Sequence, residues 1–178
     1  MARRSGINYI LDISNVVDHS IYYNLEMPYY NSILTQIKEA KVILDIGGNI
    51  GNSALFYASI NPTAKILSFE PHPDTFKKEL ENISINPFQN IKVINLGLGT
   101  QRASFKLYEV EEGNPGMNRI LMHETEFPYK MIEVDILDDI LKAKTLTKLI
   151  LLKLMLKVSN IPYCWVQKNI KNETYFIY

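Results

Sequence analysis

The sequence predicts an α/β protein whose core is a parallel, doubly wound sheet with helices on its faces. Three short apolar runs, at 41–45, 64–69 and 91–96, are the basis of this prediction. Glycines follow the first run, and stretches with helical spacing separate the three. Strands that alternate with helices at this spacing are typical of a parallel sheet.

The composition indicates one compact domain and excludes several classes of protein. The chain has 178 residues, of which 47% are hydrophobic, and 19 basic residues balance 19 acidic ones. Nucleic-acid-binding domains usually carry a basic excess, so we expect no nucleic-acid partner. The single cysteine, Cys164, excludes a disulfide within the chain. The first 30 residues lack the apolar segment of a signal peptide, so we expect a cytoplasmic protein without a membrane partner.

The first strand follows an N-terminal lead-in. We expect residues 1–40 to be helical and irregular, with apolar residues of 31–39 on one helical face. The run at 41–45 is short, apolar and stopped by glycines, which predicts a strand buried on both faces. A helix is predicted at 52–59, before the second strand at 64–69.

The second and third strands flank a helix that begins after two prolines. Pro71 and Pro73 end the second strand, and Asp74 is a candidate N-cap for the helix. We expect an apolar stripe on this helix, formed by Phe76, Leu80 and Ile83. His72 lies between the prolines, where an exposed loop residue is expected more than a catalytic one.

Beyond Gly99 the apolar pattern changes to a period of two. It predicts an antiparallel pair at 103–110 and 130–134, joined by a turn-rich segment. Its loop at 111–118 either covers a substrate or is an ordinary hairpin connection. Helical spacing returns at 135–141. This segment contains three acids, Asp135, Asp138 and Asp139. They suit a helix N-terminus better than a metal site, so no metal is predicted.

The turn after the first strand has the clearest chemical meaning. It reads Asp45-Ile-Gly-Gly-Asn-Ile-Gly51, and its glycines allow the backbone to approach a ligand closely. Glu70, at the end of the second strand, can accept both hydroxyl hydrogens of a ribose. This combination predicts a site for a cofactor that contains adenosine.

Two cofactors that contain adenosine, NAD and S-adenosyl-L-methionine, are compatible with this prediction. An NAD site uses G-x-G-x-x-G and places a pyrophosphate at the helix N-terminus. This loop instead reads D-x-G-G-x-x-G, and the carboxylate of Asp45 would repel a pyrophosphate. S-adenosyl-L-methionine has no phosphate, and its ammonium and sulfonium favour a nearby carboxylate. The loop therefore favours the methyl donor over NAD.

Three runs of the sequence resemble the FkbM family of S-adenosyl-L-methionine-dependent methyltransferases: VILDIGGNIGNSALFYA, ILSFEPHPDTFKKELENISIN and IKVINLGLG. The likeness covers residues 40–141 and includes F-E-P-x-P and L-x-x-N-x-x-x-N, the latter with Leu80 displaced by one position before Asn82 and Asn86. One mild departure is Gly48, where family members often have alanine.

The resemblance implies a class I methyltransferase (Rossmann-like) fold. It also implies O-methyl transfer from S-adenosyl-L-methionine to a hydroxyl of a sugar or natural product, so the partner would be a small-molecule or glycan acceptor. On this chain Glu70 would hold the ribose of the donor. The methionine part would be enclosed by Asp45, Gly47, Gly48, Asn49 and Gly51. No catalytic base is identified.

The C-terminal part departs from the family pattern. The family has a strand reading K-I-D-V-E-G-x-E, which supplies acids to the site, where this chain has the apolar run at 149–158. Decoded one base earlier, permitted codons for 149–169 give IDFIKIDVEGFEYTVLLGAKN, which contains that strand and the helix after it. We therefore expect a one-base deletion near 142–144. The plainer alternative is an apolar helix or strand of a divergent protein.

On this interpretation, 41–148 is a partial methyltransferase domain and 149–178 an out-of-frame tail that leaves the sheet incomplete at the C-terminus. We nevertheless expect 149–155 to form a strand beside the first one, because an apolar run is the best available cover for it. Two other functions stay open: an NAD-binding Rossmann oxidoreductase fragment, and an inactive remnant of a methyltransferase gene.

Overall fold

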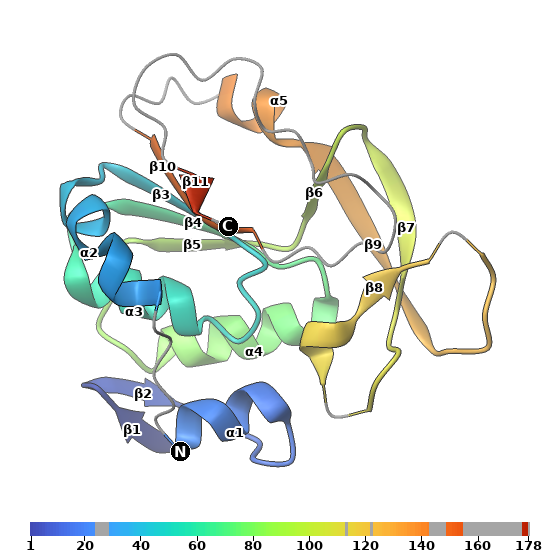
Figure 1. The fold of residues 1–178 in the computed structure, drawn as a ribbon, viewed down its shortest axis with the longest axis horizontal. Helices are drawn as coiled ribbons and strands as arrows, with labels where there is room; N and C mark the ends of the chain where they lie inside the picture. Colours follow the sequence, from blue (N-terminus) through green and yellow to red (C-terminus); the bar gives the residue numbers. More distant parts are fainter. Residues whose placement is uncertain (24–28, 113, 122, 143–148, 155–175, 178) are drawn as a thin grey trace.

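A five-stranded parallel sheet forms the centre of the molecule (Figure 1). The structure, a computed structural model, describes residues 1–23, 29–112, 114–121, 123–142, 149–154 and 176–177. The strand order is β11-β10-β3-β4-β5, and every neighbouring pair is parallel. The strands are β3 (Val42–Ile46), β4 (Lys65–Phe69), β5 (Ile91–Ile94), β10 (Leu149–Leu154) and β11 (Phe176–Ile177).

The three predicted strands are thus parallel neighbours, and β3 is enclosed between β4 and β10. All five residues of β3 are buried, as the glycine-bounded apolar run predicts. The order β5-β4-β3-β10 is the third, second, first and fourth strand, which is the order of a Rossmann-like doubly wound sheet. The prediction of an α/β, class I fold is therefore confirmed.

Helices cover both faces of this sheet. On one face, Ile43 and Ile66 pack against α2 (Tyr29–Glu39) and α3 (Asn52–Ile60). On the other, Leu44 and Leu67 form a cluster with Leu137 of α5 (Leu137–Lys142). Figure 1 shows α5 on the side of the sheet away from α2 and α3.

The N-terminal segment begins with a hairpin, which corrects the expectation that 1–40 is only helical and irregular. β1 (Ala2–Arg4) pairs antiparallel with β2 (Ile7–Tyr9), and α1 (Val16–Tyr22) follows. Ser5 and Gly6 both have positive φ, of 48° and 83°, as a tight hairpin turn requires. Strands of three residues are too short to show alternation in the sequence, so only the Ser-Gly pair signals the hairpin.

The apolar stripe predicted on α4 (Pro73–Ser84) is confirmed for Ile83, which packs against the core, and for the half-buried Phe76, but is wrong for Leu80. The buried residues of this helix are Thr75, Glu79 and Asn82, whereas Leu80 is 42% exposed. Asp74 is not the N-cap: His72 caps the helix, and its side chain accepts a hydrogen bond from the backbone N–H of Thr75. The helix therefore presents polar groups to the interior, toward the turn that follows β3.

A second sheet of four strands lies beside the first (Figure 1), in the order β6-β9-β7-β8. β7 (Ala103–Tyr108) and β9 (Tyr129–Ile136) are antiparallel, which confirms the predicted pair. β9 extends through Asp135, so this acid belongs to a strand and not to the predicted helix. The remaining elements are β6 (Gly97–Gly99), β8 (Arg119–Ile120) and a 3-10 helix at Pro115–Met117 within the predicted loop.

The apolar run at 149–154 forms a strand, β10, of the main sheet. β10 pairs in parallel with β3 from Leu149 to Leu154, as the sequence predicts. Several predictions for the C-terminal part lie outside the described residues. They concern Cys164, positions 143–144 of the expected frame change, and most of the segment that was decoded in the other reading frame. In the described part of the chain, no helix is long and apolar enough to cross a membrane.

Candidate cofactor site

The turn between β3 and α3 has an unusual backbone. Gly47, Asn49 and Gly51 all have positive φ, of 81°, 52° and 88°. Glycine adopts this region without strain, and asparagine tolerates it better than most residues. The loop can therefore turn sharply at three places, which brings its peptide groups close to the end of β4.

Backbone hydrogen bonds fix the loop against that strand end. The N–H groups of Gly47 and Gly48 both donate to the carbonyl oxygen of Phe69, at 2.9 and 3.1 Å. The N–H of Gly51 donates to the carbonyl oxygen of Gly48 at 3.0 Å and closes the turn. The glycine loop and the residue before Glu70 are thus one hydrogen-bonded unit.

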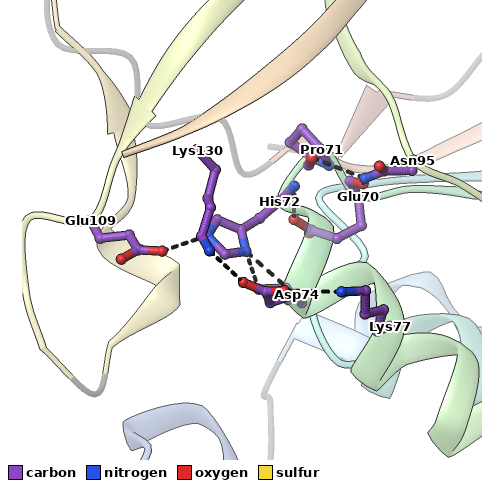
Figure 2. Close-up of polar contacts among 9 residues, drawn as sticks. Glu70, Pro71, His72, Asp74, Lys77, Asn95, Glu109 and Lys130 are labelled. Carbon is purple, nitrogen blue, oxygen red and sulfur yellow. Dashed lines mark hydrogen bonds and ion pairs between the residues drawn. The ribbon is translucent and has the colours of Figure 1, made fainter. Parts of the chain in front are cut away.

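Glu70 joins this unit through its side chain. Its Oε2 accepts a hydrogen bond from the backbone N–H of Asn49 at 2.8 Å, and its Oε1 accepts one from the N–H of His72 at 2.9 Å. Its own backbone is held by Asn95, whose Nδ2 donates to the Glu70 carbonyl oxygen at 2.8 Å (Figure 2). The structure therefore places Glu70 in contact with the glycine loop, as the sequence predicts.

The polar groups of the loop suit a cationic ligand that carries hydroxyls. The side chain of Asp45 is buried at the end of β3, directly before the loop. The Oδ1 atom of Asn49 is buried and accepts no hydrogen bond from the described residues. An unsatisfied buried acceptor is costly unless a donor reaches it. Two carboxylates and this amide oxygen favour a cationic ligand with hydroxyl groups and disfavour an anionic pyrophosphate.

Gly48 has a structural role that the sequence does not reveal. A Cβ at this position would lie 2.2 Å from Oγ of Ser68 and 2.6 Å from Oε1 of Glu79. These two side chains are buried and joined by a 2.6 Å hydrogen bond from Ser68 to Glu79. The space that a Cβ at position 48 would need is taken by a buried carboxylate from α4 and the hydroxyl of Ser68.

Glu79 stands where the motif described above has its leucine. In L-x-x-N-x-x-x-N the leucine precedes the first asparagine by three positions, and that position here is Glu79. Its side chain lies under the loop, with its Cγ 3.1 Å from where a Cβ of Gly51 would be. Glu79 is a residue that the sequence did not reveal, and its carboxylate fills the space that the missing side chain of Gly48 leaves open.

The two motif asparagines tie the N-terminal hairpin to the site. Asn82 accepts a hydrogen bond from the N–H of Ile10 at 2.7 Å and donates one to the carbonyl oxygen of Ile50 at 2.9 Å. Asn86 accepts from the N–H of Asn8 and donates to its carbonyl oxygen. These two asparagines therefore connect the glycine loop, α4 and the N-terminal hairpin.

His72 is buried, which corrects the expectation of an exposed loop residue. It is 6% exposed, and its Nε2 lies 2.9 Å from Oε1 of Glu109, which follows β7. Beside it, Lys130 of β9 forms an ion pair of 2.9 Å with Asp74 of α4 (Figure 2). The hydrogen bond from Lys130 lowers the pKa of the Asp74 carboxyl, with Lys77 contributing. Two bridges thus connect the start of α4 to the second sheet.

A groove lies on the opposite face of the second sheet. Its volume is about 350 Å³, and its lining includes Lys106, Tyr108 and Glu124. Lys106 and Glu124 form an ion pair of 2.8 Å, which lowers the pKa of the Glu124 carboxyl. In the β7–β9 register Lys106 faces Met131, while Leu107 faces Lys130, so the groove and the bridge to α4 are on different faces.

Known proteins show a partial similarity. Methyltransferase 1 of Beauveria bassiana is 37% identical over 65 residues, which are 36% of this chain and 26% of that protein. The chain therefore matches only a minor part of this curated relative, and the similarity is to a methyltransferase. No protein-family model matches the chain, so the resemblance to the FkbM family stays a prediction.

Solved structures show similarity over half of the chain. Precorrin-6y C5,15-methyltransferase of Geobacter metallireducens is 12% identical, with a TM-score of 0.37 over 49% of this chain and 43% of that one. TYW2 of P. horikoshii in complex with MeSAdo is 23% identical, with a TM-score of 0.35 over 53% and 34%. With superpositions this partial, the fold assignment depends on the strand order described above.

Proposed function

We propose that this chain binds S-adenosyl-L-methionine and belongs to a methyltransferase that transfers the methyl group to a hydroxyl of a sugar or natural product. The observation that supports it best is the Glu70 carboxylate, which lies at the carboxyl edge of the sheet and is bonded to the N–H of Asn49 in the glycine loop. Ligands of doubly wound sheets bind in the crevice outside this edge. The similarity to a methyltransferase agrees with it.

Each residue of the predicted site then has a role. Glu70 would accept hydrogen bonds from the ribose hydroxyls, because a carboxylate oxygen can accept more than one hydrogen bond. The loop residues would enclose the methionine part, with Oδ1 of Asn49 accepting from the ammonium. When bound, S-adenosyl-L-methionine supplies an electrophilic methyl group on a sulfonium. The contribution of the protein is to hold an acceptor oxygen in line with it.

The methyl donor and NAD make opposite demands on this loop, so a direct titration separates them. The full chain should bind S-adenosylhomocysteine, the demethylated donor, with saturable heat in calorimetry, and NADH should not compete. Glu70→Ala should weaken binding, whereas Glu81→Ala, an exposed acid on α4, should not. Saturable binding of NADH alone would favour the oxidoreductase instead.

The sequence of the tail carries a separate hypothesis. We propose a one-base deletion near 142–144, which predicts that resequencing the gene around codons 140–150 finds one further base. The corrected chain would contain KIDVEGFE, and its acids would be candidates for the missing catalytic base. An unchanged gene sequence, together with binding of neither S-adenosylhomocysteine nor NADH, would favour the inactive remnant.

A further inference from the structure

His72 lies between the candidate donor site and the second sheet. Its backbone N–H donates to Oε1 of Glu70, and its side chain reaches Glu109 on the other side (Figure 2). His72 is nearly fully buried, and its contact with Glu70 is buried, whereas the Glu109 side chain is 34% exposed. One residue therefore touches the carboxylate proposed to hold the ribose and an acid of the second sheet.

The hydrogen bonds of the imidazole define its tautomer. Nδ1 lies 3.4 Å from the backbone nitrogen of Thr75, which can only donate, so Nδ1 is the acceptor. In the neutral ring the proton is then on Nε2, which donates to Oε1 of Glu109 at 2.9 Å. Each ring nitrogen has a defined partner, and the ring orientation is fixed by both.

Glu109 is itself fixed to both long strands of the second sheet. It directly follows β7, and its backbone N–H donates to the carbonyl oxygen of Pro128, directly before β9, at 2.8 Å. A movement of the β7–β9 pair would therefore move Glu109. Through the hydrogen bond from Nε2 of His72, it would also move the backbone N–H of His72, which donates to Glu70. The exposed Lys130–Asp74 pair runs alongside this connection.

We propose that His72 is a positioning residue that couples Glu70 to the second sheet, so that binding of the methyl donor at Glu70 restrains β7 and β9. This inference rests on the proposed function. The connected face of the second sheet is the one that carries Lys130, which pairs there with Asp74 at the start of α4. The role of His72 is mechanical, because both of its ring nitrogens are engaged.

The test measures hydrogen exchange of the β7 and β9 backbone with and without S-adenosylhomocysteine. In the wild-type chain, binding should slow exchange in both strands by about fivefold, the lower range of couplings between sites. His72→Asn should lose this effect: asparagine still caps α4 and keeps the backbone N–H to Glu70, but it is too short to reach Glu109. Glu109→Ala should also lose it, and this variant leaves the helix cap intact if His72→Asn does not fold.

Two further variants separate coupling from general damage. Glu109→Gln keeps the acceptor oxygen for Nε2–H and should retain the slower exchange. Lys77→Ala removes an exposed ion pair on the same helix turn and should behave as wild type. Two results would overturn this inference but not the proposed function. One is that exchange still slows in both His72→Asn and Glu109→Ala; the other is that the wild-type chain binds the ligand with no slowing of exchange. Failure of the wild-type chain to bind S-adenosylhomocysteine would instead overturn the proposed function, and the inference with it.

Discussion

The glycine loop and the second sheet are held in place by different kinds of contact. The loop is fixed by backbone hydrogen bonds to Phe69 and by the buried Ser68–Glu79 pair. The second sheet is tied to α4 by the His72–Glu109 contact and by an ion pair whose side chains are 41% and 51% exposed. Buried hydrogen-bonded groups are expensive to disturb, whereas exposed ion pairs contribute little. The glycine loop is therefore the more rigid of the two regions, and the placement of the second sheet is the more adjustable.

The largest expected effect is on the rigid side, from Gly48→Val. The new side chain would press into the buried carboxylate of Glu79 and the hydroxyl of Ser68. Overpacking costs about 1–3 kcal/mol, and breaking the buried hydrogen bond adds to it. Urea unfolding should show a lower unfolding free energy than for the wild type. The same substitution in a Ser68→Ala, Glu79→Ala background should cost less; an equal cost there would show that the strain lies elsewhere.

Glu70→Ala should have the next largest effect, on binding of S-adenosylhomocysteine. Removing hydrogen bonds to a charged group should weaken affinity by about 1.5–3 kcal/mol, as calorimetry would show. Glu70→Gln retains one oxygen acceptor and should lose less. Unchanged affinity in both variants would mean that the carboxylate does not contact the donor.

Asn82→Ala tests the support beneath the loop. It leaves the carbonyl of Ile50 and the N–H of Ile10 without their partner, at a cost of about 1–3 kcal/mol of unfolding free energy. Glu81→Ala, its exposed neighbour on α4, is the matched control and should change the urea midpoint within error. Equal midpoints for the two variants would contradict the importance of these hydrogen bonds.

The difference between the two regions also explains what the sequence could predict. The strands β3, β4 and β5 and the loop after β3 depend on local signals, namely apolar runs and glycines, and these are visible in one sequence. The burial of His72 and Glu79 depends on partners 37 and 11 positions away. A polar residue at such a position resembles a surface residue until its partner is known, and so the buried face of α4 was predicted only in part.

The smallest expected effect is on the adjustable side, from Lys130→Met. The hydrogen bond between Lys130 and Asp74 lowers the carboxyl pKa and raises the ammonium pKa. The Asp74 contribution is complete above the ordinary carboxyl pKa of 3.8 and is lost as the pH falls through the lowered value. The Lys130 contribution is complete below the ordinary ammonium pKa of 10.5 and is lost as the pH rises through the raised value.

Lys130→Met should therefore lower the urea midpoint slightly at pH 7, less so in high salt, and the difference from the wild type should disappear once Asp74 is protonated. Urea titrations at pH 7 and in acid would measure this. A difference that grows in acid would show that Lys130 stabilises the protein through another contact.

The location of the bound donor tests the account most directly. Amide chemical shifts of the isotope-labelled full chain, recorded during titration with S-adenosylhomocysteine, report where the ligand binds. We predict that the largest shifts occur at residues 45–51 and 70–72, around the glycine loop and Glu70. Shifts confined to the groove of Lys106, Tyr108 and Glu124, on the far face of the second sheet, would contradict it.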